Sequence, residues 1–216
     1  RRDLAERALQ FDPECADAYV LLGEDELTRE VWTEAEGYFR KAMELSQKRL
    51  GQKFFEEHAG KFWKIIDTRP YMRALRGLAE VLWKQERKQE SIDSFKELLR
   101  LNPVDDQGNR NRLSLYLLIE NRNEELDELF EKYQGEKTAA SLFNKALVRF
   151  RLEGSSAKSR PTLTKAFNFN RYVPLYMLGY KQLPSALPKH INFGREDEAI
   201  VYTAVTYKCW AETDGS

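Results

Sequence analysis

The sequence predicts an all-α fold, a right-handed superhelix of about five helical hairpins with one insertion of about 22 residues. Three observations lead to this prediction. Apolar residues recur three and four positions apart through most of the chain, as they do on one face of a helix. Equivalent positions recur 34 residues apart, from Ala79 to Leu113 and from Leu113 to Leu147. With 11 Gly and 7 Pro in 216 residues, the chain is also poor in the turn residues that an all-β protein needs.

The first repeat carries the clearest pattern. Its marker residues are Tyr19, Leu22, Gly23, Glu26, Ala35, Phe39 and Ala42. These spacings match the tetratricopeptide repeat, in which small residues let the two helices of a hairpin approach and large residues fill the space beside them. The step from Gly23 to Ala79 is 56 residues, which is one period of 34 plus 22. An insertion is therefore predicted between these two positions.

Local turn chemistry divides the predicted single domain, residues 1–216, into segments. They are a half unit at 1–13, the first repeat at 14–45, the insertion at 46–68, the second repeat at 69–103, the third at 104–137, the fourth at 138–171 and an atypical capping unit at 172–216. Asp12-Pro13 and Asn102-Pro103 are predicted to end helices, because proline lacks a backbone donor and restricts the residue before it. Gly154 is predicted to end a further helix.

Two segments depart from the repeat. The insertion is rich in aromatic and aliphatic residues, so we expect a helix extension followed by a turn at Gly60. Residues 181–192 contain Pro184 and Pro188, which favours an ordered, extended connection. Acidic residues at 196–198 then suit the start of the last helix.

The ends of the chain and its cysteines give weaker expectations. Residues 1–12 have the pattern of only the second helix of a hairpin, and the chain begins with Arg1, so we expect a fragment with a partner helix upstream, or else a solvent-facing cap. Cys15 and Cys209 are far apart in sequence, which predicts free thiols in a reducing compartment, the cytoplasm. No apolar stretch approaches the roughly 18 residues of a membrane span.

Three longer motifs are more specific than the repeat. They are Thr68-Arg-Pro-Tyr-Met-Arg73 with Gly77-Leu-Ala79, Leu101-Asn-Pro-Val-Asp-Asp-Gln-Gly108, and Asn168-Phe-Asn-Arg-Tyr-Val-Pro-Leu-Tyr-Met-Leu178 followed by Glu198-Ala-Ile-Val-Tyr202. Together they resemble the repeat-bearing part of the suppressor of tumorigenicity seven family and its bacterial relatives, over nearly the whole chain. The resemblance implies a helical repeat domain, with no catalytic activity established for the family. Arg171, Asn109 and Arg112 depart from the family's usual residues, which puts the local packing of the third repeat in doubt.

Charge and motif content argue against several functions. The chain has 35 Lys and Arg against 35 Asp and Glu, so it lacks the basic excess with which proteins attract nucleic acid or anionic membranes. Metalloprotease, nucleophile-elbow, paired-cysteine and phosphate-loop motifs are all missing from the sequence. His58 and His190 are predicted to be a solvated helix residue and a loop residue. We therefore predict no enzyme, no cofactor and no metal.

A peptide-binding groove is the leading functional hypothesis. In a tetratricopeptide superhelix the first helix of each hairpin lines the concave face, and the repeat register projects onto it Arg73, Arg76, Glu80, Gln107, Arg110, Asn144, Arg151, Tyr176 and Tyr180. Guanidinium and amide groups hold extended peptides and carboxylates, and Tyr adds apolar area with a polar tip. The sequence thus predicts a protein or peptide partner, bound through an extended segment that is acidic or C-terminal.

Two other functions remain open from the sequence. The chain could be a purely structural segment in which the arginines pair internally, for instance Arg73 or Arg76 with Glu80, and the insertion fills the groove. Single-stranded RNA binding through Arg and Tyr stacking is the other, but the zero net charge and the acidic first repeat count against it. The sequence specifies neither the partner nor the oligomeric state.

Overall fold

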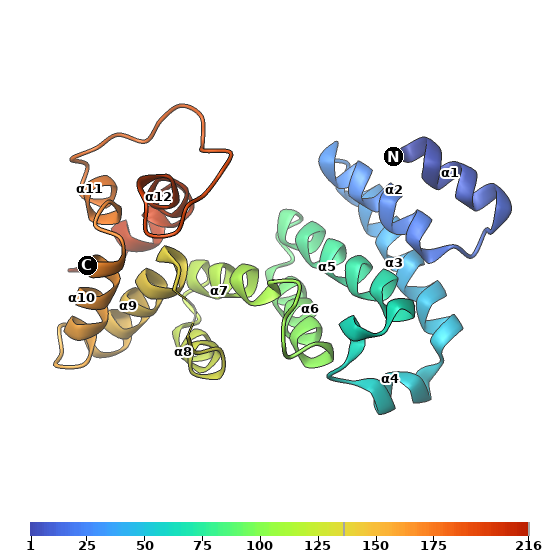
Figure 1. The fold of residues 1–216 in the computed structure, drawn as a ribbon, viewed down its shortest axis with the longest axis horizontal. Coiled ribbons are helices and arrows are strands. Elements are labelled where there is room, and N and C mark those ends of the chain that lie inside the picture. Colours follow the sequence, from blue (N-terminus) through green and yellow to red (C-terminus); the bar gives the residue numbers. More distant parts are fainter. Residues whose placement is uncertain (136, 216) are drawn as a thin grey trace. The chain divides into compact units, whose positions relative to one another are not determined.

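A computed structural model describes residues 1–135 and 137–215, and these residues form helices and turns without any strand (Figure 1). They group into two compact units, Arg1–Leu113 and Ser114–Ser216, which we call the N-terminal and C-terminal units. The predicted all-α fold class is confirmed for the described residues. The two units divide after Leu113, inside the predicted third repeat, while the segment boundaries proposed above stay a prediction.

The N-terminal unit consists of helices that follow one another through short turns. They are α1 (Arg2–Phe11), α2 (Ala16–Thr28), α3 (Trp32–Leu50), α4 (Gln52–His58), α5 (Arg69–Lys84) and α6 (Lys88–Leu101), with two 3-10 turns, Phe62–Lys64 and Ile66–Thr68, before α5. Helix α7 (Asn109–Ile119) begins in this unit. As predicted from their prolines, α1 and α6 end immediately before Asp12-Pro13 and Asn102-Pro103.

The C-terminal unit continues the hairpin pattern. Its helices are α8 (Asn123–Lys132), α9 (Ala139–Glu153), α10 (Ser159–Phe169), α11 (Val173–Met177) and α12 (Glu196–Ala211). Helix α9 ends at Gly154, which adopts a φ of +63° that favours glycine, and Pro161 lies in the first turn of α10. Three acidic residues open α12, where they face the positive end of the helix dipole.

The core of the N-terminal unit is built around Phe39. This side chain is fully buried, and its ring lies against Gly23 of α2 and Gly77 of α5. A Cβ added at Gly23 would lie 2.7 Å from Phe39 Cε1, and one added at Gly77 would overlap the same ring. Gly23 and Gly77 therefore let α2, α3 and α5 pack closely around the Phe39 ring, which is the role that the repeat pattern predicts for its small residues.

The insertion forms a separate small aromatic cluster. Helix α3 extends to Leu50 as predicted, but Gly51 at φ +80° ends it, so α4 is a new helix. Phe55 then makes edge contacts with the rings of Phe62 and Tyr71, at centroid distances of 4.9 and 4.8 Å. Because Tyr71 belongs to α5, these contacts hold the insertion against that helix.

A buried carboxylate organises the C-terminal unit. Glu198, only 6% exposed, accepts hydrogen bonds from the backbone N–H groups of Ala139 and Gly194, both at 2.7 Å, and from Asn170 Nδ2 at 3.1 Å. It thereby joins α9, α12 and the turn after α10.

The connection between α11 and α12, residues 178–195, is irregular and almost entirely exposed. It is fastened at both ends to the first turn of α12, because Lys181 pairs with Glu196 and Asn192 donates to Asp197. The predicted extended connection, residues 181–192, lies within this irregular stretch. Within the described ranges, none of the helices is both long and apolar enough to cross a bilayer.

Candidate functional site

A cavity in the N-terminal unit gathers most of the residues that were projected onto the groove there. Its volume is about 420 Å³, and we call it the Arg73 cavity. The lining residues are Glu24, Leu27, Phe39, Trp63, Arg73, Arg76, Gly77, Glu80 and Gln107. Helices α2 and α5 supply most of them, and on α5 the spacing of three and four positions places them on one face. Four of the predicted residues, Arg73, Arg76, Glu80 and Gln107, are brought together.

Arg73 lies across the cavity from α2. Its Nη2 pairs with Asp17, and the two side chains are 39% and 49% exposed. Its Nε is shielded from solvent and has no acceptor among the described residues. Arg73 therefore has a hydrogen-bond donor that its ion pair with Asp17 does not use. Leaving such a shielded donor without an acceptor costs stability.

Arg76 and Glu80 form the second charged group of the Arg73 cavity. Arg76 Nη1 donates to the carbonyl oxygen of Gln107 at 3.1 Å, and its Nε lies 3.6 Å from Glu80 Oε1. Arg112 Nε is 4.0 Å from the same oxygen. The negative charges of Glu24 and Glu80 balance the positive charges of Arg73 and Arg76, so the lining residues carry no net charge. The arginines are thus partly paired within the protein, as the structural hypothesis expects.

Trp63 is the lining residue that the repeat register could not predict. It belongs to the insertion, in the 3-10 turn Phe62–Lys64, and the Arg69 guanidinium lies 5.2 Å from the centre of its ring. The insertion therefore contributes an aromatic wall to the Arg73 cavity and leaves the cavity itself open.

Arg110 does not line this cavity. Asp105 Oδ1 accepts the backbone N–H of Asn109 at 2.7 Å, and Asp105 Oδ2 accepts that of Arg110 at 3.0 Å, which caps α7. The Arg110 side chain turns back to the same carboxylate, with Nη1 at 3.4 Å from Oδ2. This local contact at the start of α7 explains why Arg110 does not join the other projected residues at the cavity.

The two groove residues predicted on α9 lie inside the C-terminal unit. Asn144 is buried, and its Oδ1 accepts the Tyr202 hydroxyl at 3.0 Å. Arg151 donates to the carbonyl oxygens of Cys209 at 2.7 Å and Leu118 at 3.1 Å. Burial lowers the pKa of the Arg151 guanidinium. Both side chains are thus engaged with α12 and α7, because the last helix packs on the face that the repeat register projects as open.

The two predicted tyrosines differ from each other. Tyr176 is buried, its hydroxyl donates to Glu196 Oε1 at 2.8 Å, and burial raises its pKa. Tyr180 is 77% exposed on the irregular connection after α11. Neither residue belongs to the Arg73 cavity, so the structure does not gather the predicted set into one site.

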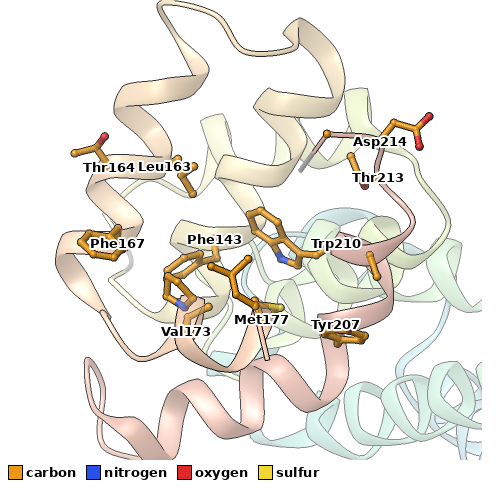
Figure 2. A pocket seen from close by; sticks show the side chains of 14 residues that line it. Phe143, Leu163, Thr164, Phe167, Val173, Met177, Tyr207, Trp210, Thr213 and Asp214 are labelled. Atoms are coloured by element: carbon orange, nitrogen blue, oxygen red, sulfur yellow. The ribbon is translucent and has the colours of Figure 1, made fainter. Parts of the chain in front are cut away.

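A larger cavity, of about 750 Å³, lies in the C-terminal unit, and we call it the Trp210 cavity. Its lining is mostly apolar: Phe143, Leu163, Thr164, Phe167, Val173, Pro174, Met177, Leu178, Tyr207, Trp210, Ala211, Thr213, Asp214 and Gly215. Figure 2 shows Leu163 and Phe167 of α10 on one side, Trp210 of α12 facing them, and Asp214 beyond Trp210. Leu163 and Phe167 lie four positions apart on α10, and each is 44% exposed.

Metal-binding groups do not gather in the part of the chain that the structure describes. That part contains no cluster of three or more His, Cys, Asp and Glu side chains able to hold a metal ion. His58 stacks on Phe54 at a centroid distance of 4.0 Å, and its Nδ1 lies 3.1 Å from the Phe54 carbonyl oxygen. Cys15 and Cys209 are free thiols.

Comparison with known proteins identifies relatives over the whole chain. A sequence model of the ST7 protein family matches residues 1–216. The chain is 27% identical to Suppressor of tumorigenicity 7 protein-like of Gallus gallus over 236 residues, covering 98% of this chain and 42% of that protein. It is 26% identical to Suppressor of tumorigenicity 7 protein of Macaca fascicularis, covering 94% of this chain and 42% of that protein. The chain thus spans about two fifths of the length of these curated relatives.

One solved structure is similar at lower identity. YrrB, described as a TPR protein with an unusual peptide-binding site, is 19% identical with a TM-score of 0.43. The alignment covers 83% of this chain and 97% of that one.

Proposed function

This chain belongs to the ST7 protein family, and we propose that it acts as a non-catalytic protein-interaction module whose Arg73 cavity holds an extended peptide segment of a partner. The observation that carries the proposal is the convergence of Arg73, Arg76 and Gln107 on one cavity with an aromatic wall at Trp63. Guanidinium groups bind peptide carbonyls and carboxylates, and an aromatic wall adds apolar contact area.

The preference for an acidic or C-terminal segment depends on Arg73. The lining charges balance, so the cavity has no net positive charge with which to attract an acid. Arg73 nevertheless has an Nε donor without an acceptor, next to an ion pair with Asp17 that is about half exposed. A carboxylate of the partner would displace Asp17 and accept hydrogen bonds from both Nε and Nη2 of Arg73. This charge-assisted contact at two nitrogens would replace a single weak surface ion pair.

Two pools of labelled ten-residue peptides test the proposal by fluorescence anisotropy. The pools share their apolar positions, and one carries Asp and Glu where the other carries Lys. We expect the acidic pool to bind more tightly, and Arg73→Gln to weaken its binding about tenfold or more, as the loss of a hydrogen bond between charged groups would. Arg49→Gln is the control, because Arg49 is 76% exposed and lies outside the cavity. Equal binding of the acidic pool to wild type and Arg73→Gln would refute the acidic preference.

The structural alternative has its own support in this chain. Arg151 and Asn144 are committed to internal partners, and Arg73 and Arg76 each contact a carboxylate of the same unit. If the chain only spaces or supports other parts of a larger protein, Arg73→Gln should lower the Tm without changing any peptide binding. The same anisotropy series, read beside thermal melts of the two variants, separates this outcome from the proposed function.

A further inference from the structure

The Trp210 cavity has the dimensions and lining of a ligand site. Its volume of about 750 Å³ falls within the range of roughly 300–1,000 Å³ that is typical of small-molecule sites. Side chains of α9, α10, α11 and α12 all contribute, and Leu163, Phe167 and Tyr207 remain 44–51% exposed. Covering these side chains would remove a substantial apolar surface from water, which favours binding of an apolar molecule.

The polar groups of the cavity restrict the chemistry of a ligand. Most of them are already engaged within the protein: Thr164 Oγ1 donates to the Arg160 carbonyl at 3.0 Å, Thr213 Oγ1 to the Cys209 carbonyl at 2.8 Å, and Trp210 Nε1 to the Tyr202 hydroxyl at 2.9 Å. Among the described lining residues Asp214 is the one that carries a charge, and no lysine, arginine or histidine accompanies it.

We propose that the Trp210 cavity binds a small apolar molecule that bears an amine at one end. The apolar body lies between Phe167 of α10 and Trp210 of α12, and the ammonium group reaches Asp214, which Figure 2 shows beyond Trp210. An anionic molecule of the same shape is disfavoured, because the one charge among the described lining residues is the negative charge of Asp214. The site lies wholly within the C-terminal unit and does not depend on peptide binding at the Arg73 cavity.

A dye-displacement experiment tests both parts of the proposal. The reporter is N-phenyl-1-naphthylamine, a neutral dye whose fluorescence rises in apolar surroundings. Decylammonium and decanoate, used below their micelle concentrations, share an apolar chain and differ in head charge. We expect the dye to bind and decylammonium to displace it at a concentration about two- to fivefold lower than decanoate, which is the difference that one exposed ion pair provides. No binding of the dye to the folded protein would overturn the proposal, and so would equal displacement by the two chains.

Two variants of α10 establish where the dye binds. Thr164→Trp adds an indole ring at a lining position of the cavity and should weaken dye binding. Thr162→Trp is the matched control, because Thr162 makes the same kind of hydroxyl bond one turn back, to the Lys158 carbonyl at 3.1 Å, but does not line the cavity. Equal dye binding by the two variants, both folded by circular dichroism, would place the dye elsewhere and refute the proposal.

Substitutions of Asp214 test the preference for a charged head group, and the fluorescence of Trp210 tests where the ligand binds. Asp214→Asn should remove the preference for decylammonium, and Asp214→Lys should reverse it in favour of decanoate. Trp210 is the one tryptophan of residues 114–216, so its emission can be followed after Trp32, Trp63 and Trp83 are replaced by Phe. Decylammonium should shift this emission. An unchanged preference in Asp214→Lys, or an unchanged Trp210 emission on saturation, would contradict the assignment.

Discussion

Phe39 shows how one side chain sets the distance between helices. Its ring occupies the space that a side chain at Gly23 or Gly77 would need, and all three positions are at the point where α2, α3 and α5 meet. Because protein interiors are packed as densely as crystals, even one added methyl group at such a contact must displace its neighbours.

Gly77→Ala is therefore expected to destabilise the protein by about 1–3 kcal/mol, since the new Cβ overlaps the Phe39 ring. Gly37→Ala, on α3, is the matched control, because a Cβ there meets nothing within 4 Å. That variant should be stabilised by about 0.5–1 kcal/mol, the usual gain when alanine replaces glycine within a helix. Urea denaturation measures both, and a Gly77→Ala protein as stable as Gly37→Ala would contradict this packing.

An ion pair between Glu36 and Arg87 connects the first predicted repeat to the second. Its Oε1 and Oε2 lie 2.8 and 2.9 Å from Arg87 Nη1, and Arg40 Nε also donates to Oε1. Burial raises the pKa of Glu36, but the hydrogen bonds from Arg87 and Arg40 outweigh it, so the pKa lies below its usual value of 4.5. The ion pair therefore stabilises the fold above about pH 4.5, and its contribution is lost as the pH falls through the folded-state pKa.

Glu36→Gln should accordingly lower the Tm at pH 7, and the difference from wild type should shrink as the pH falls below 4.5. Glu34→Gln, at an exposed position in the first turn of the same helix, serves as the control. Thermal melts between pH 7 and pH 3 provide the measurement. A constant Tm difference across this range would show that the carboxylate of Glu36 does not contribute through its charge.

At the scale of elements, the partly buried guanidinium of Arg151 is one of the contacts that join α9 to α12. Arg151 of α9 donates to the carbonyl of Cys209, and its Nε donates to Thr213 Oγ1 at 2.9 Å, just beyond the end of α12. It also reaches the carbonyl of Leu118 in α7. These carbonyls lie at helix C-termini, where backbone acceptors lack partners within their own helix.

Replacement of this residue, Arg151→Met, keeps most of the apolar stem and removes the donors. We expect a loss of about 2–4 kcal/mol, because several carbonyl groups lose a charged hydrogen-bond partner at once. Hydrogen exchange should show reduced protection of the α12 amides in particular. Arg160→Met, whose Nε contacts only the Ser155 hydroxyl in an exposed position, is the control. Undiminished protection of α12 would contradict the role assigned to Arg151.

At the scale of the whole molecule, the repeat register predicts the fold and part of the candidate site. The spacing of Gly23 and Phe39 follows from the geometry of a hairpin, and the α5 residues Arg73 and Arg76 follow from helical periodicity, so both are accessible from sequence. Arg110 departs from the projection because the Asp105 cap captures it locally.

The remaining features depend on contacts that no repeat encodes. Arg151 finds its acceptor 58 residues away on α12, which packs where the register projects open groove. Trp63 lies in the insertion, outside the period altogether, and its position follows from the aromatic packing of Phe55, Phe62 and Tyr71. A periodic pattern predicts the helices and their faces, whereas the partners of those faces are determined by tertiary packing.

The central claim, that Arg73 binds a partner and does more than hold α2 to α5, is tested most directly by a charge exchange. The double variant Asp17→Arg/Arg73→Asp keeps an ion pair between the two helices but reverses its direction. We expect its Tm to stay close to that of wild type while its affinity for the acidic peptide pool falls about tenfold or more. A double variant that is folded and still binds the acidic pool as tightly as wild type would contradict the claim.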